Sequence, residues 1–137
     1  MEEKINLEII SPERLVVSEV VDEVTAPGAK GEFGVLPGHT LFVTTLDVGP
    51  ASYRIGTERK NLVVSGGIAD VGPDKVILLA DVVEQEEEID LERAEAAKER
   101  AEARLAGESD EEEIDFERAR IALQKALIRI QVASKNK

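Results

Sequence analysis

Short apolar runs separated by turn residues fill the first 83 positions of the chain. Ile5, Leu7 and Ile9 alternate with polar residues, which is the period-two pattern of a half-buried strand. Further β-branched runs follow at 14–17, 20–26, 41–46, 51–56, 61–65, 68–71 and 75–83. Turns are expected at the glycine- and proline-containing steps between runs, which are Pro27-Gly28, Gly49-Pro50, Gly66-Gly67 and Gly72-Pro73-Asp74. Many short strands without a crossover helix predict an antiparallel sandwich or barrel.

The pattern changes at Glu84, where an acidic linker leads into residues that favour helix. Asp90 is the expected N-cap of a first helix, and Gly107 is its expected stop. A second acidic linker leads to a second expected N-cap at Asp115. Alanines at helical spacing mark a narrow face on the first helix, whereas the second helix carries a broader apolar face. The sequence therefore predicts two domains, a β domain at 1–84 and an antiparallel two-helix hairpin at 85–137.

Composition excludes several classes of function. With 29 acidic residues against 17 basic ones, a net charge of −12 and 3% aromatic residues, nucleic-acid binding is not expected. The absence of cysteine and the single histidine exclude thiolate chemistry and a structural zinc site. No apolar run approaches the roughly 20 residues that cross a bilayer. The N-terminus lacks a signal-peptide pattern, so we expect a cytoplasmic chain that meets a membrane only through a protein partner.

The sequence offers little for catalysis. His39 has no cysteine and no second histidine to work with, so it is expected to be a turn or interface residue. Ser65-Gly66-Gly67 lacks the context of a nucleophilic serine, and no phosphate-binding glycine motif is present. The chain is therefore predicted not to be an enzyme, with a free-standing hydrolase of sandwich fold as the rival hypothesis.

Basic residues of the predicted hairpin form a candidate binding strip. Arg93, Arg100 and Arg104 lie close to one stripe of the first helix, while Lys125 and Arg129 are four residues apart on the second. In an antiparallel hairpin these groups would come level and could hold a polyphosphate or an acidic protein segment. The alternative is that the arginines pair within their own helix. The acidic partners would then be Glu92, Glu95, Glu99 and Glu102.

Four motifs follow one another along residues 4 to 134. They are Gly31-Glu32-Phe33-Gly34-Val35-Leu36-Pro37-Gly38-His39, Val64-Ser65-Gly66-Gly67, Leu79-Ala80-Asp81, and a tail that ends Ile130-Gln131-Val132-Ala133. In this order and spacing the chain resembles the epsilon subunits of bacterial F-type ATP synthases. The resemblance implies a ten-stranded antiparallel β-sandwich followed by the helical hairpin.

The resemblance also implies a function. The family member is a non-catalytic rotor subunit of the central stalk that binds the gamma subunit and the ring of c subunits. Glu32 matches the position that faces the polar loops of the c ring, and His39 is expected on the same end of the sandwich. The resemblance further implies that the hairpin permits ATP hydrolysis when folded on the sandwich, and inhibits it when extended up along gamma, where it would meet the alpha and beta subunits. The implied location is peripheral, on the cytoplasmic face of the bacterial inner membrane, and a homodimer of the isolated chain is left open.

Some members of the family bind ATP through an Ile/Leu-Asp-x-x-Arg-Ala motif in the hairpin. Residues 89–94 fit this motif, and Lys125 stands where the best ATP binders have arginine. Lysine keeps the charge but loses the bidentate fork, so weak or absent binding stays an alternative. The resemblance implies no metal and no required cofactor, only ATP as a regulatory ligand. The residues that match the site are Glu84, Ile89, Asp90, Arg93, Ala94, Arg100, Lys125 and Arg129.

Overall fold

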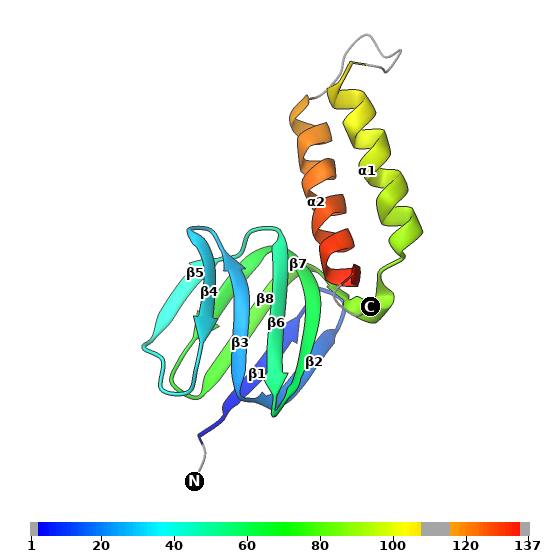
Figure 1. The fold of residues 1–137 in the computed structure, drawn as a ribbon. Helices are drawn as coiled ribbons and strands as arrows, with labels where there is room; N and C mark the ends of the chain where they lie inside the picture. The colour runs from blue at the N-terminus through cyan, green and yellow to red at the C-terminus, as the bar shows by residue number, and fades with distance from the viewer. Residues whose placement is uncertain (1–2, 108–115, 135–137) are drawn as a thin grey trace. The chain divides into compact units, whose positions relative to one another are not determined.

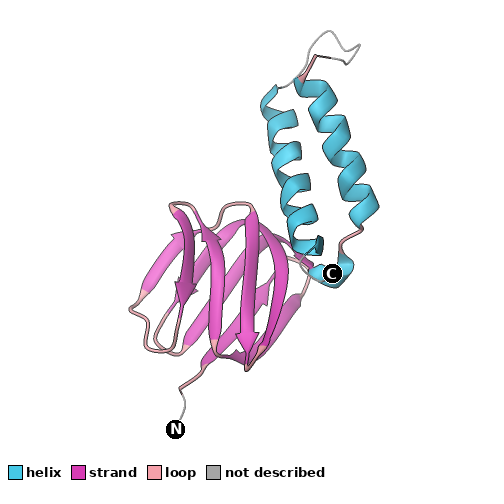
Figure 2. Ribbon diagram, viewed as in Figure 1, coloured by secondary structure: helices cyan, strands magenta, loops and turns pink. Residues whose placement is uncertain are grey.

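The structure is a computed structural model that describes residues 3–107 and 116–134. Its contacts divide the chain into two compact units, Met1–Glu86 and Glu87–Lys137 (Figure 1). The first unit holds the strands and the second holds both α-helices (Figure 2). The second expected N-cap, Asp115, and the acidic linker before it lie outside the described residues.

In the described part of the first unit, eight strands form one hydrogen-bonded sheet. They are β1 (Ile5–Ile10), β2 (Leu15–Val21), β3 (Glu23–Gly28), β4 (Gly31–Val35), β5 (Phe42–Thr45), β6 (Gly49–Ile55), β7 (Glu58–Val71) and β8 (Lys75–Gln85). Neighbouring strands follow the order β2-β1-β8-β7-β6-β3-β4, and β5 pairs with β7 beside this path. The sheet folds over itself, so that its two halves form the layers of a sandwich (Figure 1).

The long strand β7 belongs to both layers. Its first half pairs with β6 and its second half pairs with β5. Between the halves lie Gly66 and Gly67, with φ values of +69° and +114°, which glycine adopts far more readily than other residues. The pairing with β8 stays in register on both sides of this point, so β7 and β8 bend together.

The expected β-sandwich is correct, but the expected number of strands, ten, and the expected antiparallel direction of every strand pair are not. Because β7 and β8 each run through both layers, eight strands supply the segments of a sandwich that would otherwise need ten. The pair β1–β8 is parallel, not antiparallel. The residues between these two strands build the rest of the sandwich, so the parallel pair needs no crossover helix.

Three of the four expected turns are parts of strands. Pro27-Gly28 closes β3, Gly49-Pro50 opens β6, and Gly66-Gly67 is the bend within β7. Only Gly72-Pro73-Asp74 joins two strands as expected. Proline is tolerated near the ends of strands, and glycine occurs in bends within a strand as well as in turns. Glycine and proline alone therefore did not distinguish a strand end or a bend from a turn between two strands.

The alternation predicted for the first strand is confirmed. Ile5, Leu7 and Ile9 are 0–1% exposed, and they join a single cluster with inward residues of both layers. That cluster also contains Val24 of β3 and Leu78 of β8. The sandwich therefore has one hydrophobic core, to which each strand of alternating pattern contributes one face.

The second unit is a hairpin of α1 (Leu91–Leu105) and α2 (Phe116–Ser134), preceded by the short 3-10 helix η1 (Glu86–Glu88) (Figure 1). Asp90 is the N-cap, because its side chain accepts a hydrogen bond from the Arg93 N–H at 3.1 Å. Gly107 follows the C-cap with a φ of +77°, which confirms the expected stop. Neither helix, over its described residues, is long and apolar enough to span a membrane.

Alanines form the seam between α1 and α2. The helices contact each other along the hairpin, and alanines seven residues apart on each helix are buried. Such small side chains let two helices approach closely and leave the wider faces of both helices for other contacts. The buried alanines are Ala94, Ala101, Ala119 and Ala126.

Candidate functional site

Glu32 and His39 lie at opposite ends of β4. Glu32 is exposed next to the start of the strand, where it pairs with Pro27. His39 lies in the loop beyond the end of the strand, and its N–H donates to the carbonyl of Leu36 at 3.2 Å. The expectation that Glu32 and His39 lie on the same end of the sandwich is therefore wrong. The first half of the glycine-rich motif is an extended strand, and five residues of strand span roughly 16 Å.

The loop histidine belongs to a small aromatic cluster. Its Nδ1 is 2.7 Å from the Thr40 carbonyl oxygen, and its ring lies 6.2 Å from the ring of Phe42. Phe42 in turn makes an edge-on contact with Phe33 at 5.4 Å. Leu41, which lies between His39 and Phe42 in the sequence, is 83% exposed. The contacts of the His39 side chain are a backbone carbonyl and an aromatic ring, which fits a turn or interface residue.

The strand register assembles a row of apolar side chains on the outer face of one layer. Leu79 of β8 pairs with Ile68 of β7 on one side and with Ile10 of β1 on the other, and Ile10 pairs with Leu15 of β2. Leu15, Leu79 and Ile68 are 54%, 48% and 47% exposed. We call these four residues the outer apolar row.

Sequence reasoning missed this row because the order of the strands decides which residues become neighbours. A local signal was nevertheless present. Ile10 follows the buried Ile9, and Leu79 follows the buried Leu78, so each places an apolar residue where the alternation of apolar and polar residues would put a polar one. An apolar residue at an outward position of an otherwise alternating strand is a candidate contact for a partner.

The hairpin brings part of the predicted cationic strip together. Arg93 lies in the first turn of α1 and Arg129 near the end of α2, which is the same end of the hairpin (Figure 1). Arg100 and Lys125 lie in the middle of their helices. Over residues 87–107 and 116–134, the α1 arginines make no ion pair with the glutamates of their own helix.

The residues that match the nucleotide motif have different local roles. Asp90 caps α1 and Ala94 is buried in the helix seam, so both residues have a structural role that does not require a ligand. Ile89 is half-buried just before the cap. Glu84 pairs with Val63 as part of β8 and so belongs to the first unit.

Helix α2 has a charge opposite to that of the whole chain. It carries four basic residues against one acidic residue, Glu117, whereas the chain has a net charge of −12. Arg120 pairs with Glu117 one turn away, and the hydrogen bonds that its guanidinium donates to that carboxylate raise the pKa of Arg120. The remaining basic residues of this helix are Arg118, Lys125 and Arg129. A helix of this charge is suited to an acidic partner.

No group of three potential metal-ligating side chains occurs among residues 3–107 and 116–134. Most acidic residues of the described strands and helices are instead spread over exposed positions, and Glu23 is engaged by Arg59. Three surface features of the described residues are candidate contacts: the outer apolar row, the loop of His39, and the basic residues of the hairpin.

Both units match models of known domains. Residues 4–86 match the ATP synthase Delta/Epsilon chain beta-sandwich domain, and residues 87–134 match the long alpha-helix domain of the same chain. The ATP synthase epsilon chain of Syntrophobacter fumaroxidans is 54% identical over 110 residues, which cover 80% of this chain and 82% of the relative. ATP synthase epsilon chain 2 of Syntrophotalea carbinolica is 47% identical over 135 residues, with 98% and 97% covered.

Solved structures agree with these matches. A chain of the Euglena gracilis mitochondrial ATP synthase, in a structure of OSCP, F1 and the c-ring, superposes with a TM-score of 0.81 and 28% identity. The match covers 98% of this chain and 83% of that one. A chain of the Tetrahymena thermophila central stalk and c-ring shares the fold with a TM-score of 0.57 and 14% identity, over 98% and 97% of the two chains. The chain therefore belongs to the family of epsilon subunits of bacterial F-type ATP synthases, as its motifs predicted.

Proposed function

We propose that this chain is a non-catalytic subunit of the ATP synthase central stalk, whose sandwich joins gamma to the c ring and whose hairpin regulates ATP hydrolysis. The observation that carries the proposal is that both domains match in order over residues 4–134, and that a chain from a structure of F1 with its c-ring matches 98% of this chain. The proposed location is the cytoplasmic face of the bacterial membrane, as a peripheral protein.

The sandwich offers two separate contacts for this role. The outer apolar row would be covered by gamma, since an exposed apolar strip across several strands is costly to leave in water. Glu32 would meet the polar loops of the c ring. Because β4 separates His39 from Glu32, we assign the histidine loop, with its exposed Leu41, to gamma instead of the ring.

The hairpin offers the regulatory contact. Its buried alanine seam holds the two helices together, and α2 carries an excess of basic residues, a charge that suits an acidic segment of the beta or alpha subunit. An element that moves between two packings needs contacts for both, and α2 carries exposed apolar side chains, Ile121 and Leu127, in addition to its seam.

The regulatory role predicts a clear effect of removing the hairpin. A chain that ends at Glu86 keeps the whole sandwich core, so it should fold and still bind a complex of alpha, beta and gamma subunits. Only the full chain should slow ATP hydrolysis by that complex, because the inhibitory contacts are proposed to lie on α2. Equal inhibition by both forms in a hydrolysis assay, with binding verified by co-elution, would refute the assignment to the hairpin.

The second candidate function is ATP sensing by the hairpin. The favouring observation is that Asp90 and Ala94 have structural roles, whereas the guanidinium of Arg93 makes no ion pair with the described residues. ATP that bridges Arg93 and Arg129 would hold the folded hairpin. At one hundred times its dissociation constant, ATP would stabilise that state by about 2.7 kcal/mol, which reverses a modest conformational bias.

Isothermal titration of the full chain with ATP measures this function. We expect saturable binding that Arg93→Ala weakens roughly tenfold or more, since a charge-assisted contact to phosphate is lost. Lys98→Ala removes the same charge from the same helix and should leave the affinity within about twofold. If millimolar ATP gives no heat of binding, or if both variants behave alike, Arg93 is not a nucleotide ligand and the stalk function stands unaffected.

A further inference from the structure

Strand β5 is an edge strand with one open side. Among the described strands it pairs with β7 alone. Residues 36–46, which include this strand, contain no Asp, Glu, Lys or Arg, whereas 34% of the chain is charged. Leu41 and Val43 are nevertheless 83% and 69% exposed. An uncharged and exposed strand edge is a template on which another extended segment can pair.

The register decides which backbone groups of β5 face the open side. The Leu46 N–H donates to the Gly67 carbonyl at 2.8 Å, in continuation of the β5–β7 ladder. Because hydrogen-bonded pairs alternate along an antiparallel ladder, Val43 exchanges no hydrogen bonds with β7. Its N–H and C=O therefore point to the open side, and the described residues supply neither with a hydrogen bond. The Thr45 carbonyl points the same way and accepts from the Ala29 N–H at 2.9 Å, as this alternation requires.

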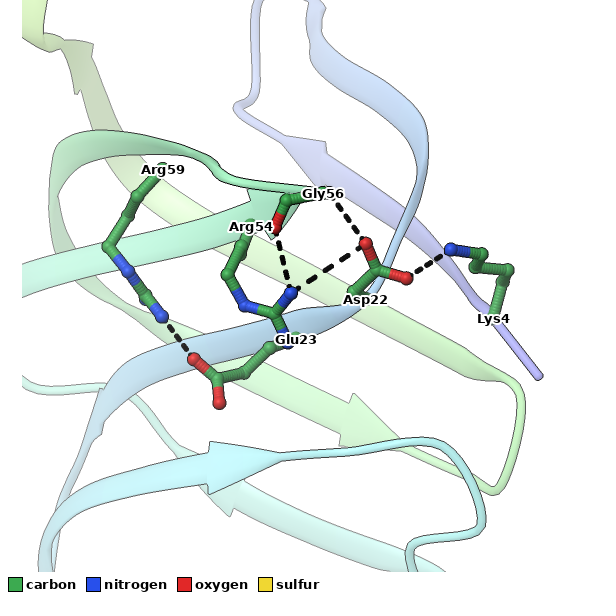
Figure 3. Close-up of polar contacts among 6 residues, drawn as sticks. All are labelled: Lys4, Asp22, Glu23, Arg54, Gly56 and Arg59. Atoms are coloured by element: carbon green, nitrogen blue, oxygen red, sulfur yellow. Dashed lines mark hydrogen bonds and ion pairs between the residues drawn. The ribbon is translucent and has the colours of Figure 1, made fainter. Parts of the chain in front are cut away.

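The two other edge strands of the sandwich carry charge. Glu19 of β2 and Glu32 of β4 are both exposed. Elsewhere on the sandwich charged residues pair with each other, as Glu23 of β3 does with Arg59 of β7 (Figure 3). Since a charged side chain on an edge strand discourages the addition of a further strand, β5 is the edge best suited to one.

The outer apolar row leads to this open edge. Ile68, at one end of the row, pairs with Thr45, and Val43 lies on the same outward face of β5 as Thr45. A chain that covers the row therefore reaches the edge of β5. A second copy does not suit this place, because each copy has a net charge of −12 and carries an exposed Asp70 opposite Val43. Gamma is the chain to which the proposed function assigns the row.

We propose that gamma adds an extended segment to β5 as the next strand of this sheet, an inference that rests on the proposed stalk function. In this arrangement the Val43 N–H donates to a carbonyl of the added segment, and the Val43 carbonyl accepts from one of its N–H groups. Alternate side chains of the segment lie on the outer face, where apolar residues continue the surface of the row. The backbone bonds hold the segment, and these side chains select it.

Hydrogen exchange of the full chain, free and bound to purified gamma, tests strand addition directly. In the free chain the Val43 amide should exchange at close to the unprotected rate, whereas the Thr44 amide, which is bonded to β7, should be protected. Binding of gamma should slow the exchange of Val43 roughly 100-fold or more. If gamma binds and Val43 still exchanges fast, the inference is wrong and the stalk function stands. If gamma does not bind, both fail.

Val43→Pro distinguishes a backbone bond from simple burial. It removes the N–H and keeps an apolar side chain, and an edge strand tolerates proline where the N–H is not used by its neighbour. The affinity for gamma, measured by titration calorimetry, should fall roughly tenfold or more, because a carbonyl of gamma is left unpaired. Val43→Ile changes the side chain but keeps the N–H, so it should cost about threefold at most.

An affinity of Val43→Pro equal to that of the wild type, or equal losses in both variants, would overturn the proposal. Circular dichroism verifies that each variant is folded. Should Val43→Pro not fold, the exchange of the Val43 amide in the wild-type complex decides alone, since it requires no substitution.

Discussion

Gly67→Ala is expected to destabilise the sandwich by about 3 kcal/mol or more, the largest effect of any single substitution considered. An added Cβ would lie 1.9 Å from the Leu79 carbonyl oxygen and 2.8 Å from the Ala80 Cα, which are backbone atoms of the paired strand. The φ of +114° is also strained for any residue with a side chain. Because β7 bends here to join the layers, the backbone has no nearby alternative conformation. The sandwich transition followed by circular dichroism should shift down by roughly 12 °C or more.

Gly34→Ala is the matched control for this substitution. Gly34 lies in the edge strand β4, an added Cβ there meets nothing within 4 Å, and its φ is not in the positive range. Its melting temperature should stay within a few degrees of wild type, because alanine also restricts the unfolded chain. If Gly67→Ala has the same melting temperature as Gly34→Ala, the bend does not require a residue without a side chain at position 67.

Ile68→Asp together with Leu79→Asp is expected to weaken binding to gamma by roughly 100-fold or more. The two side chains are neighbours at the β7 end of the outer apolar row, and burying two carboxylates under an apolar partner is strongly unfavourable. Both positions are about half exposed in the free chain, so the fold itself should be little affected. Titration calorimetry or biolayer interferometry against purified gamma measures the change.

Val20→Asp with Ile55→Asp controls for charge and exposure. These side chains are 54% and 42% exposed but lie outside the row, and the pair adds the same two negative charges. We expect their gamma affinity to stay within roughly fivefold of wild type. Similar losses in both double variants would mean that net charge, and not the row, determines the binding.

Local chemistry made part of the structure predictable. The alternation of β1, the Asp90 cap and the Gly107 stop depend on interactions within a few residues, and all three are confirmed. Glycine and proline gave an ambiguous signal, because a strand end, a bend and a turn can use the same residues. Gly66-Gly67 was therefore predicted to separate two strands that are in fact one.

The contact surfaces were less predictable because they depend on strand order and register. The outer apolar row joins residues of β1, β2, β7 and β8, which are up to 69 positions apart in the chain, from Ile10 to Leu79. The error at His39 has a related cause, since the motif that looked like one corner contains a strand. In the hairpin, by contrast, helical spacing and the expected antiparallel arrangement were enough to place Arg93 and Arg129 at one end.

Complex formation between the full chain and the gamma subunit of the same organism tests the central claim most directly. Size-exclusion chromatography with light scattering gives the mass of the complex without any assay of activity. The account predicts one chain per gamma, stable through elution for the wild type and absent for Ile68→Asp with Leu79→Asp. If the folded wild-type chain elutes separately from folded gamma, the chain is not the central-stalk subunit proposed here.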